Sequence, residues 1–200
     1  MTSLAIIDSG GANISSVSFA CRRLGAEPVF TADPEVIAAA DRVILPGVGA
    51  ARAAMDHLRS SGLVDCIRGL TQPVLGICLG MQLLFESSTE GDTDCLGMIP
   101  ARLDRLAGGE GLRVPHMGWN STALEMDDIL MTGMPEMPWF YFVHSYAAPI
   151  GRFTVASCRH GQSFSAVVRH RNFCGAQFHP ERSAEHGAAL LKNFLELPCS

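Results

Sequence analysis

A cysteine set between two glycines is the part of this sequence best suited to nucleophilic chemistry. Gly76, Cys78 and Gly80 lie in the segment PVLGICLGMQ, where an apolar run gives way to a helical pattern. Glycines two residues before and two residues after a nucleophile mark a sharp strand-to-helix turn that exposes it. The N-terminus of the following helix would favour the thiolate, which is the stronger nucleophile. A buried cysteine at an ordinary turn fits the same spacing, so the choice depends on a base.

His179 is the histidine best placed to be that base. It ends the apolar run FCGAQF and is followed by Pro180 and Glu181. Proline biases the preceding residue toward an extended conformation, in which residues two apart face the same way. We therefore predict Cys78 as the nucleophile, His179 as general base and acid, and Glu181 as the carboxylate that orients the imidazole.

The other histidines are weaker candidates. His116 and His144 lie in strand-like runs and remain alternative bases. Four more lie on presumed helices or near turns, where we expect solvated side chains: His57, His160, His170 and His186.

Acyl transfer also needs donors for the oxyanion. The backbone N–H of Leu79, the residue after the nucleophile, is one. The segment LPGVGA has glycines at 47 and 49, which let a peptide N–H turn toward a site. We predict that the N–H groups of Val48 and Gly49 supply the second donor, although a plain turn into the next helix fits this segment equally.

The order of the predicted elements explains how these residues could meet. Short apolar runs alternate with helical patterns through the first half of the chain, giving the order βαβαβαβα. This order implies a parallel sheet with helices on both faces, and ligands bind beyond the carboxyl ends of such strands. The predicted strands are 4–8, 27–31, 42–45 and 73–77; the predicted helices are 13–25, 34–40, 50–69 with a break near Gly62, and 78–86.

The pattern of apolar residues changes beyond Gly91. Strand-like runs joined by turns predict antiparallel pairs, and the chain closes with a helix over 184–197. The predicted late strands are 113–120, 139–146, 153–160, 164–170 and 173–179. We predict one α/β domain over residues 1–200: an open, twisted, mostly parallel sheet with helices on both faces and antiparallel strands in the C-terminal half.

Composition excludes several classes of protein. The chain has 200 residues, 48% of them hydrophobic, a mean hydropathy of +0.20 and a net charge of −5. No basic run favours nucleic acid, and no apolar run is long enough for a membrane span. Seven scattered cysteines without a CxxC pair, and no secretory signal, predict a cytosolic protein with reduced, mostly buried thiols. No Cys/His cluster has metal-ligand spacing, so we expect neither metal nor cofactor.

Three of these segments together resemble the class I, or triad, glutamine amidotransferases: GICLGMQLLFE, PGVGA and FHPE. The resemblance implies an open α/β sheet and a Cys–His–Glu triad that hydrolyses the side-chain amide of glutamine. Three further segments are similar to the glutaminase subunits of imidazole glycerol phosphate synthase, an enzyme of histidine biosynthesis: VPHMGWN, YFVHSY and GAQFHPERS. The similarity covers nearly the whole chain.

The resemblance also implies a partner and further site residues. The partner is the cyclase subunit, a (β/α)₈ barrel that receives the ammonia and forms a heterodimer with the glutaminase; 200 residues cannot contain that barrel as well. The residues implied to hold the amino-acid end of glutamine are Gln82, Glu90, His144, Ser145 and Tyr146. Those implied to face the cyclase are Asn13, Trp119, Asn120, Tyr141 and Arg182. The chain departs from the family pattern at Ser9, Ala12 and Arg182.

Three alternatives remain. One is a class I glutaminase that serves another pathway, although these commonly carry histidine where this chain has Met81. Another is a cysteine hydrolase or peptidase on the same sheet, which would not need Gln82. The third is a non-catalytic module that kept the fold.

Overall fold

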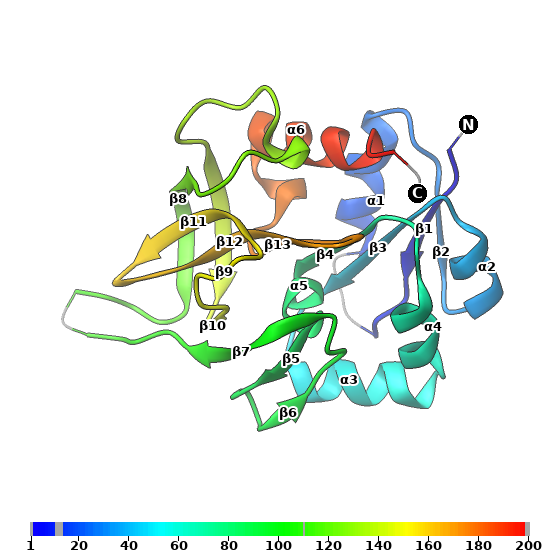
Figure 1. Cartoon of the computed structure of the whole chain (residues 1–200), viewed down its shortest axis with the longest axis horizontal. Helices are drawn as coiled ribbons and strands as arrows, with labels where there is room; N and C mark the ends of the chain where they lie inside the picture. Colours follow the sequence, from blue (N-terminus) through cyan, green and yellow to red (C-terminus); the bar gives the residue numbers. More distant parts are fainter. Residues whose placement is uncertain (1, 11–13, 110, 199–200) are drawn as a thin grey trace.

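A mixed β-sheet runs through the middle of the molecule (Figure 1). The computed structural model describes residues 2–10, 14–109 and 111–198. In these residues nine strands pair in the order β2-β1-β3-β4-β13-β12-β11-β8-β9. The first five in this order pair in parallel: β2 (Pro28–Thr31), β1 (Leu4–Ile7), β3 (Arg42–Gly47), β4 (Val74–Cys78) and β13 (Phe173–Ala176). The remainder of the sheet is antiparallel: β12 (Gln162–His170), β11 (Thr154–His160), β8 (His116–Leu124) and β9 (Trp139–His144).

Helices cover both faces of the parallel part. Alternate residues of β1 point to opposite faces, so Leu4 and Ile6 join one apolar cluster and Ala5 and Ile7 the other. The first cluster includes side chains of α1 (Ile14–Arg23) and α6 (Ala184–Leu195). The second includes side chains of α2 (Pro34–Ala39), α3 (Ala51–Ser60) and α4 (Leu63–Gly69). Figure 1 shows α6 and α3 on opposite sides of the sheet. The predicted fold class is confirmed.

Local signals account for the helix boundaries in the first half. The side chain of Asp33 accepts a hydrogen bond from the backbone N–H of Glu35 and so caps α2. Gly62 adopts a left-handed conformation, with φ 67°, that separates α3 from α4. The predicted cap of α1, Asn13, lies outside the described residues.

One predicted helix is too long. The pattern from Cys78 to Glu86 predicts a single helix, but α5 (Leu79–Leu83) is short and β5 (Phe85–Ser88) begins at once. A run of apolar residues looks the same in a buried helix and a buried strand, and here Phe85 pairs with Ile99. This strand belongs to a second sheet that the sequence did not predict, formed by β10 (Tyr146–Ala147), β7 (Ile99–Arg105), β5 and β6 (Thr93–Asp94).

The segment after β13 also differs from expectation. His179 is extended, with φ −96° and ψ 96°, as the following proline requires. Pro180–Arg182 then form a short 3₁₀ helix, η2, rather than continuing the strand. A second short 3₁₀ helix, η1, covers Ile129–Met131.

The register of the parallel strands brings three chain segments together at the carboxyl ends of β3, β4 and β13. Cys78 at the end of β4 lies opposite Gly47 at the end of β3. On the other side, Ile77 lies opposite Ala176 at the end of β13, three residues before His179. No helix within the described ranges is long and apolar enough to cross a membrane.

Candidate active site

Cys78 lies at the point where β4 turns into α5. Its backbone has φ 53° and ψ −110°, a conformation that L-residues rarely adopt. A Cβ atom on Gly76 would come 2.6 Å from the Cα of Met81, and one on Gly80 would overlap the carbonyl of Leu45. The two glycines therefore let strand, turn and helix approach closely enough to form this strained turn.

The imidazole of His179 is held between a carboxylate and the sulfur. Its Nδ1 lies 2.9 Å from Oε1 of Glu181, whose side chain is fully buried. Burial lowers the pKa of His179, but hydrogen bonds with Cys78 and Glu181 and the charges of these two groups outweigh it and raise the pKa to about 10. The ring is therefore stabilised as an imidazolium beside the sulfur of Cys78.

Ser183 fixes the backbone that carries this histidine. Its hydroxyl donates to the carbonyl of His179 at 2.7 Å and accepts from the backbone N–H of Tyr141 at 2.9 Å. The N–H of His179 also donates to the carbonyl of Tyr141 at 3.0 Å. The turn of η2 is thus tied to β9, and this tie, rather than an extended chain, sets Glu181 against the imidazole.

A cavity of about 260 Å³ lies at the carboxyl ends of these parallel strands, and most of the predicted site residues line it. Cys78 and His179 both face it, while Glu181 lies behind the imidazole. The predicted residues on its wall are Val48, Gly49, Leu79, Gln82, Glu90, His144, Ser145 and Tyr146. Two lining residues that the sequence did not single out are Pro115 and Val143, and Sγ of Cys78 lies 3.7 Å from the carbonyl of Val143.

Gln82 is buried, and its amide is committed within the protein. Its Nε2 donates to the carbonyl of Tyr146 at 2.9 Å and to Oε1 of Gln177 at 3.0 Å. Gln177 is fully buried on the chain between β13 and His179. The side chain of Gln82 therefore links α5 to the cavity wall at Tyr146.

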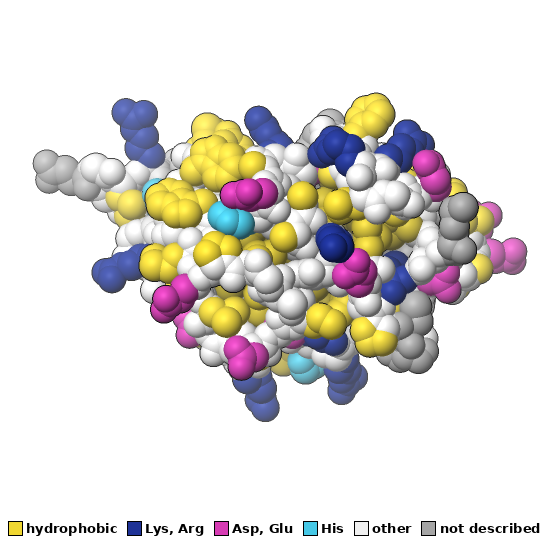
Figure 2. All heavy atoms as spheres, turned by 90° about the horizontal axis from the view of Figure 1, so that it is seen from above, with side chains coloured by type: hydrophobic (Ala, Val, Ile, Leu, Met, Phe, Trp, Pro, Cys, Tyr) yellow, Lys and Arg dark blue, Asp and Glu magenta, His cyan; other side chains and the backbone are white. Residues whose placement is uncertain are grey.

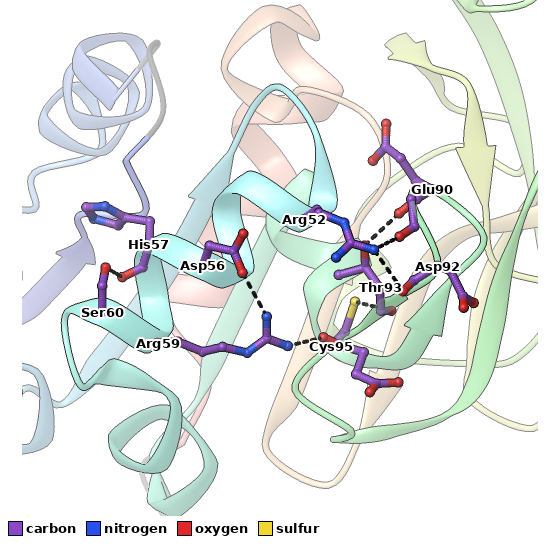
Figure 3. A network of polar contacts seen from close by, with 11 residues as sticks. Arg52, Asp56, His57, Arg59, Ser60, Glu90, Asp92, Thr93 and Cys95 are labelled. Carbon is purple, nitrogen blue, oxygen red and sulfur yellow. Dashed lines mark hydrogen bonds and ion pairs between the residues drawn. The ribbon is translucent and has the colours of Figure 1, made fainter.

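Glu90 ties the opposite wall to α3. Its carboxylate accepts a hydrogen bond of 2.8 Å from the backbone N–H of Ala51, the first residue of that helix. Figure 3 shows how Arg52 reaches from α3 to the same loop, where it donates to the carbonyls of Gly91 and Asp92. Further along α3, Arg59 donates to the carbonyl of Asp94 at 2.8 Å. These contacts fix the loop that carries Glu90 against the helix.

The 47–49 loop connects β3 to α3 beside the sulfur. Gly49 has φ 96°, a backbone conformation that is unfavourable for residues with a side chain. The hydroxyl of Ser9 donates to the carbonyl of Pro46 at 2.7 Å, directly before the loop. Ser9 is one of the departures from the family pattern, and here it anchors the start of this loop. Ala12, another departure, lies outside the described residues.

Hydrophobic side chains are exposed over the end of the molecule that carries β8 and β9 (Figure 2). Met117, Trp119 and Trp139 are among the most exposed large hydrophobic residues. The ring of Trp119 makes an edge contact with Tyr141, and the guanidinium of Arg182 lies 4.8 Å from the centre of the Tyr141 ring. Trp119, Tyr141 and Arg182, three of the residues implied to face a partner, therefore lie together. Asn13 lies outside the described residues.

The two alternative bases, His116 and His144, form a separate buried pair, and the partly buried Asn120 contacts it. Nδ1 of His116 lies 3.0 Å from Nε2 of His144, and the amide of Asn120 lies 3.2 Å from the other nitrogen of His116. His144 lines the cavity, but Glu181 contacts His179 and not this pair. The sequence did not predict that His116 and His144 would pair. The feature that could have indicated it is that both lie in predicted strands, which the structure shows to be neighbours.

The six cysteines that the structure describes are free thiols. Burial raises the pKa of Cys21 and Cys95 to about 11, and that of Cys158 and Cys174 to about 12. These four are inert core residues, as expected. Cys78 differs because it faces the cavity.

Comparisons with known proteins find relatives over nearly the whole chain. Residues 5–197 match the family model described as "Glutamine amidotransferase class-I". The chain is 55% identical to imidazole glycerol phosphate synthase subunit HisH of Xanthomonas campestris pv. campestris (strain 8004), over 98% of each chain, and 52% identical to the protein of that name from Xylella fastidiosa (strain 9a5c) over the same shares.

Solved structures show the same fold at low sequence identity. One, described as a glutamine amidotransferase, superposes with a TM-score of 0.75 at 21% identity, over 96% of this chain and 97% of that one. A second, PurLQS from Thermotoga maritima, gives 0.71 at 20% identity over 97% of each chain.

Proposed function

The chain belongs to the class I glutamine amidotransferase family, and on that premise we propose that it is the glutaminase subunit of an imidazole glycerol phosphate synthase. As a family member it has glutaminase activity, converting glutamine to glutamate and ammonia. The proposal adds the pathway, histidine biosynthesis, the residues that carry out the reaction, and the fate of the ammonia. It treats residues 1–200 as one such domain.

One observation carries the assignment of the residues. His179 shares a cavity with Cys78 and is held through its Nδ1 by the buried carboxylate of Glu181 at 2.9 Å. A nucleophile, a base and a group that orients the base are the minimum for covalent amide hydrolysis. In the proposed reaction the sulfur of Cys78 bonds to the carbonyl carbon of the glutamine side-chain amide. The carbon–nitrogen bond breaks as His179 gives its proton to the nitrogen, which leaves as ammonia, and a γ-glutamyl thioester remains.

Water completes the cycle. His179 removes a proton from a water molecule, whose oxygen attacks the γ-glutamyl thioester and releases glutamate. The sulfur leaves as thiolate, and His179 keeps the proton taken from water as an imidazolium. The new carboxylic acid loses its own proton to solvent, so the enzyme is regenerated. In both steps the oxyanion is held by the backbone N–H of Leu79 and by N–H groups of the loop at Val48 and Gly49.

The rest of the cavity wall is proposed to hold the substrate. Glu90 offers a carboxylate for the ammonium group of glutamine, and Gln82 with the 144–146 backbone surrounds its amino-acid end. All of these residues line the cavity around Cys78. The chemistry needs no metal or other cofactor.

The exposed apolar surface near the cavity is proposed to bind a separate cyclase subunit with a (β/α)₈ barrel. Trp119, Tyr141 and Arg182 lie on this surface, and Met117 beside them is 63% exposed. An exposed apolar patch of this kind is typical of a protein–protein interface. Ammonia would pass from the cavity into the barrel without entering bulk water, and the heterodimer would make imidazole glycerol phosphate.

The test replaces Cys78 with alanine in a complex with the cyclase. Synthesis that depends on glutamine should be lost, while added ammonium salts should still support synthesis because the cyclase is unchanged. Cys66, half-buried on α4, gives a matched control that should keep full activity as alanine. Glutamine hydrolysis by the Cys78→Ala complex would show that the triad is wrong. A wild-type complex that never uses glutamine would refute the function itself.

A further inference from the structure

Two buried histidines that take no part in the proposed reaction are joined beside the cavity. His116 on β8 and His144 on β9 lie directly opposite each other in the antiparallel pair. They are 4% and 5% exposed, and their facing nitrogens, Nδ1 of His116 and Nε2 of His144, are 3.0 Å apart. Polar rings are buried at a cost unless their nitrogens are all satisfied, so the positions of the protons matter.

Asn120 fixes the protons at one end of this pair. The backbone N–H of Ser121 donates to its Oδ1 at 2.9 Å, which identifies the oxygen of the amide. The amide nitrogen therefore faces Nε2 of His116 at 3.2 Å and the carbonyl of Arg159 at 3.0 Å. An amide nitrogen can only donate, so Nε2 of His116 accepts and carries no proton.

Tyr146 fixes the other end. Its carbonyl oxygen can only accept, and Nδ1 of His144 lies 2.9 Å from it, so this nitrogen carries a proton. Nδ1–H of His116 then donates to Nε2 of His144, and every N–H in the chain of hydrogen bonds points toward the cavity. A second proton on either ring would set two donors face to face. Burial agrees, since it lowers the pKa of His116 to about 4 and that of His144 to about 3.

The chain of hydrogen bonds ends on the cavity wall. The carbonyl of Tyr146 that accepts from His144 also accepts from Nε2 of Gln82 at 2.9 Å. His144, Ser145, Tyr146 and Gln82 all line the cavity. The orientation of the His144 ring, set by His116, thus determines the position of the carbonyl that holds Gln82.

We propose that His116 and His144 are positioning residues that hold the 144–146 wall and Gln82 in the shape that receives the amino-acid end of glutamine. This role rests on the proposed function, because it concerns the same cavity. Neither ring exchanges a proton with the substrate. Their effect is on binding, through the backbone.

The test compares three variants of the complex with its cyclase. In His116→Phe an aromatic ring remains against Phe142 and His160, but Nε2 of His144 loses its donor. We expect KM for glutamine to rise about tenfold or more and kcat to change less than threefold. His116→Asn can place an N–H where Nδ1 was, and should recover part of the lost affinity. His160→Phe keeps the stack on His116 without touching the chain of hydrogen bonds, and should match the wild type.

A second measurement does not depend on catalysis. Nitrogen-15 NMR of the wild-type protein at neutral pH should show both rings neutral, each with its proton on Nδ1. A charged ring, or a proton on Nε2 of His144, would overturn the chain of hydrogen bonds. An unchanged KM in His116→Phe would overturn the positioning role. If the wild-type complex fails to hydrolyse glutamine, the proposed function fails instead, and the positioning role fails with it even where the NMR signals agree.

Discussion

The backbone N–H of Ala51 donates a hydrogen bond of 2.8 Å to the carboxylate of Glu90, 39 residues further along the chain. Ala51 begins α3, and the preceding Ala50 has no side chain that can cap the helix. A carboxylate from a distant loop therefore satisfies a free N–H and opposes the positive end of the helix dipole. Because Glu90 also lines the cavity, it joins the helix that follows the 47–49 loop to the site.

Glu90→Ala should therefore affect both stability and substrate binding. Loss of a helix cap costs about 1 kcal/mol of unfolding free energy, and KM for glutamine should rise as well. Urea unfolding and steady-state kinetics measure the two effects. Asp94→Ala is the control on the adjacent strand β6, because the side chain of Asp94 is exposed. Equal stability of Glu90→Ala and Asp94→Ala would contradict the capping role.

Removing the sulfur of Cys78 should lower the pKa of His179. Cys78 and Glu181 together raise the pKa of His179 to about 10 against the opposing effect of burial. In Cys78→Ala one of these contributions is lost, so the pKa of His179 should fall. NMR titration of the imidazole measures it, with Cys66→Ala as the control. A pKa that stays at its wild-type value would mean that the sulfur does not interact with the ring.

Glu181→Gln should reduce turnover much more than binding. The buried carboxylate holds Nδ1 of His179 at 2.9 Å, and glutamine at this position offers a neutral group that can also donate, which permits the wrong orientation of the ring. We expect kcat to fall by on the order of a hundredfold or more, with KM little changed. Glu185→Gln, on the exposed first turn of α6, should behave as the wild type. An unchanged kcat would remove the orienting role.

The tight turn at Cys78 should not tolerate a methyl group on Gly80. A Cβ on Gly80 would overlap the carbonyl of Leu45, which is backbone of β3 and has little room to move. Gly80→Ala should destabilise the fold by about 2 kcal/mol or more, as overpacking of a core does. Gly69→Ala is the control, since nothing lies within 4 Å of the added atom. Similar melting temperatures for the two variants would show that β3 and α5 can separate without cost.

The neutral pair of histidines predicts a specific loss of stability in acid. Burial, followed by the charge of His160, lowers the pKa of His116 from 6.5 to about 4 in the folded protein. Between these values only the unfolded chain binds the proton, so the unfolding free energy falls as the pH falls from 6.5 toward 4. The contribution of His116 is at most about 1.4 kcal/mol per pH unit.

Urea unfolding at several pH values, with wild type and His116→Phe side by side, measures the contribution of His116 together with its effect on the neighbouring His144. Groups that do not interact with this pair cancel in the difference. The variant should lose less stability on acidification than the wild type. Parallel curves for the two proteins would mean that His116 is already charged when folded.

Much of the fold followed from the sequence because each early element has a local cause. Apolar runs, the cap at Asp33 and the break at Gly62 all lie within a few residues of the element that they define. The second sheet was missed for the opposite reason: Phe85 becomes a strand only by pairing with Ile99. The helix predicted over 78–86 is therefore helical only at Leu79–Leu83, and Phe85 begins β5.

The site likewise combines features that a local motif predicts with contacts that depend on distant parts of the chain. The spacing of Gly76, Cys78 and Gly80 is local, and the geometry of the turn shows why both glycines are needed. The contact between His179 and Glu181 was expected from an extended chain but is made by a 3₁₀ turn that Ser183 ties to β9. The pair of His116 and His144 depends on the register of β8 and β9, which no short motif encodes.

Strand β8 separates two environments by the alternation of its side chains. Met117 and Trp119 point outward to solvent, and His116 points inward, where its hydrogen bonds lead to the cavity. A partner that covers the outward side of β8 would therefore contact Met117 and Trp119, and not the His116 ring on the inward side. It can influence the site through a rigid-body shift of the strand, which would stretch the imidazole–imidazole contact, and such a shift needs only a few tenths of an ångström to weaken a hydrogen bond of 3.0 Å.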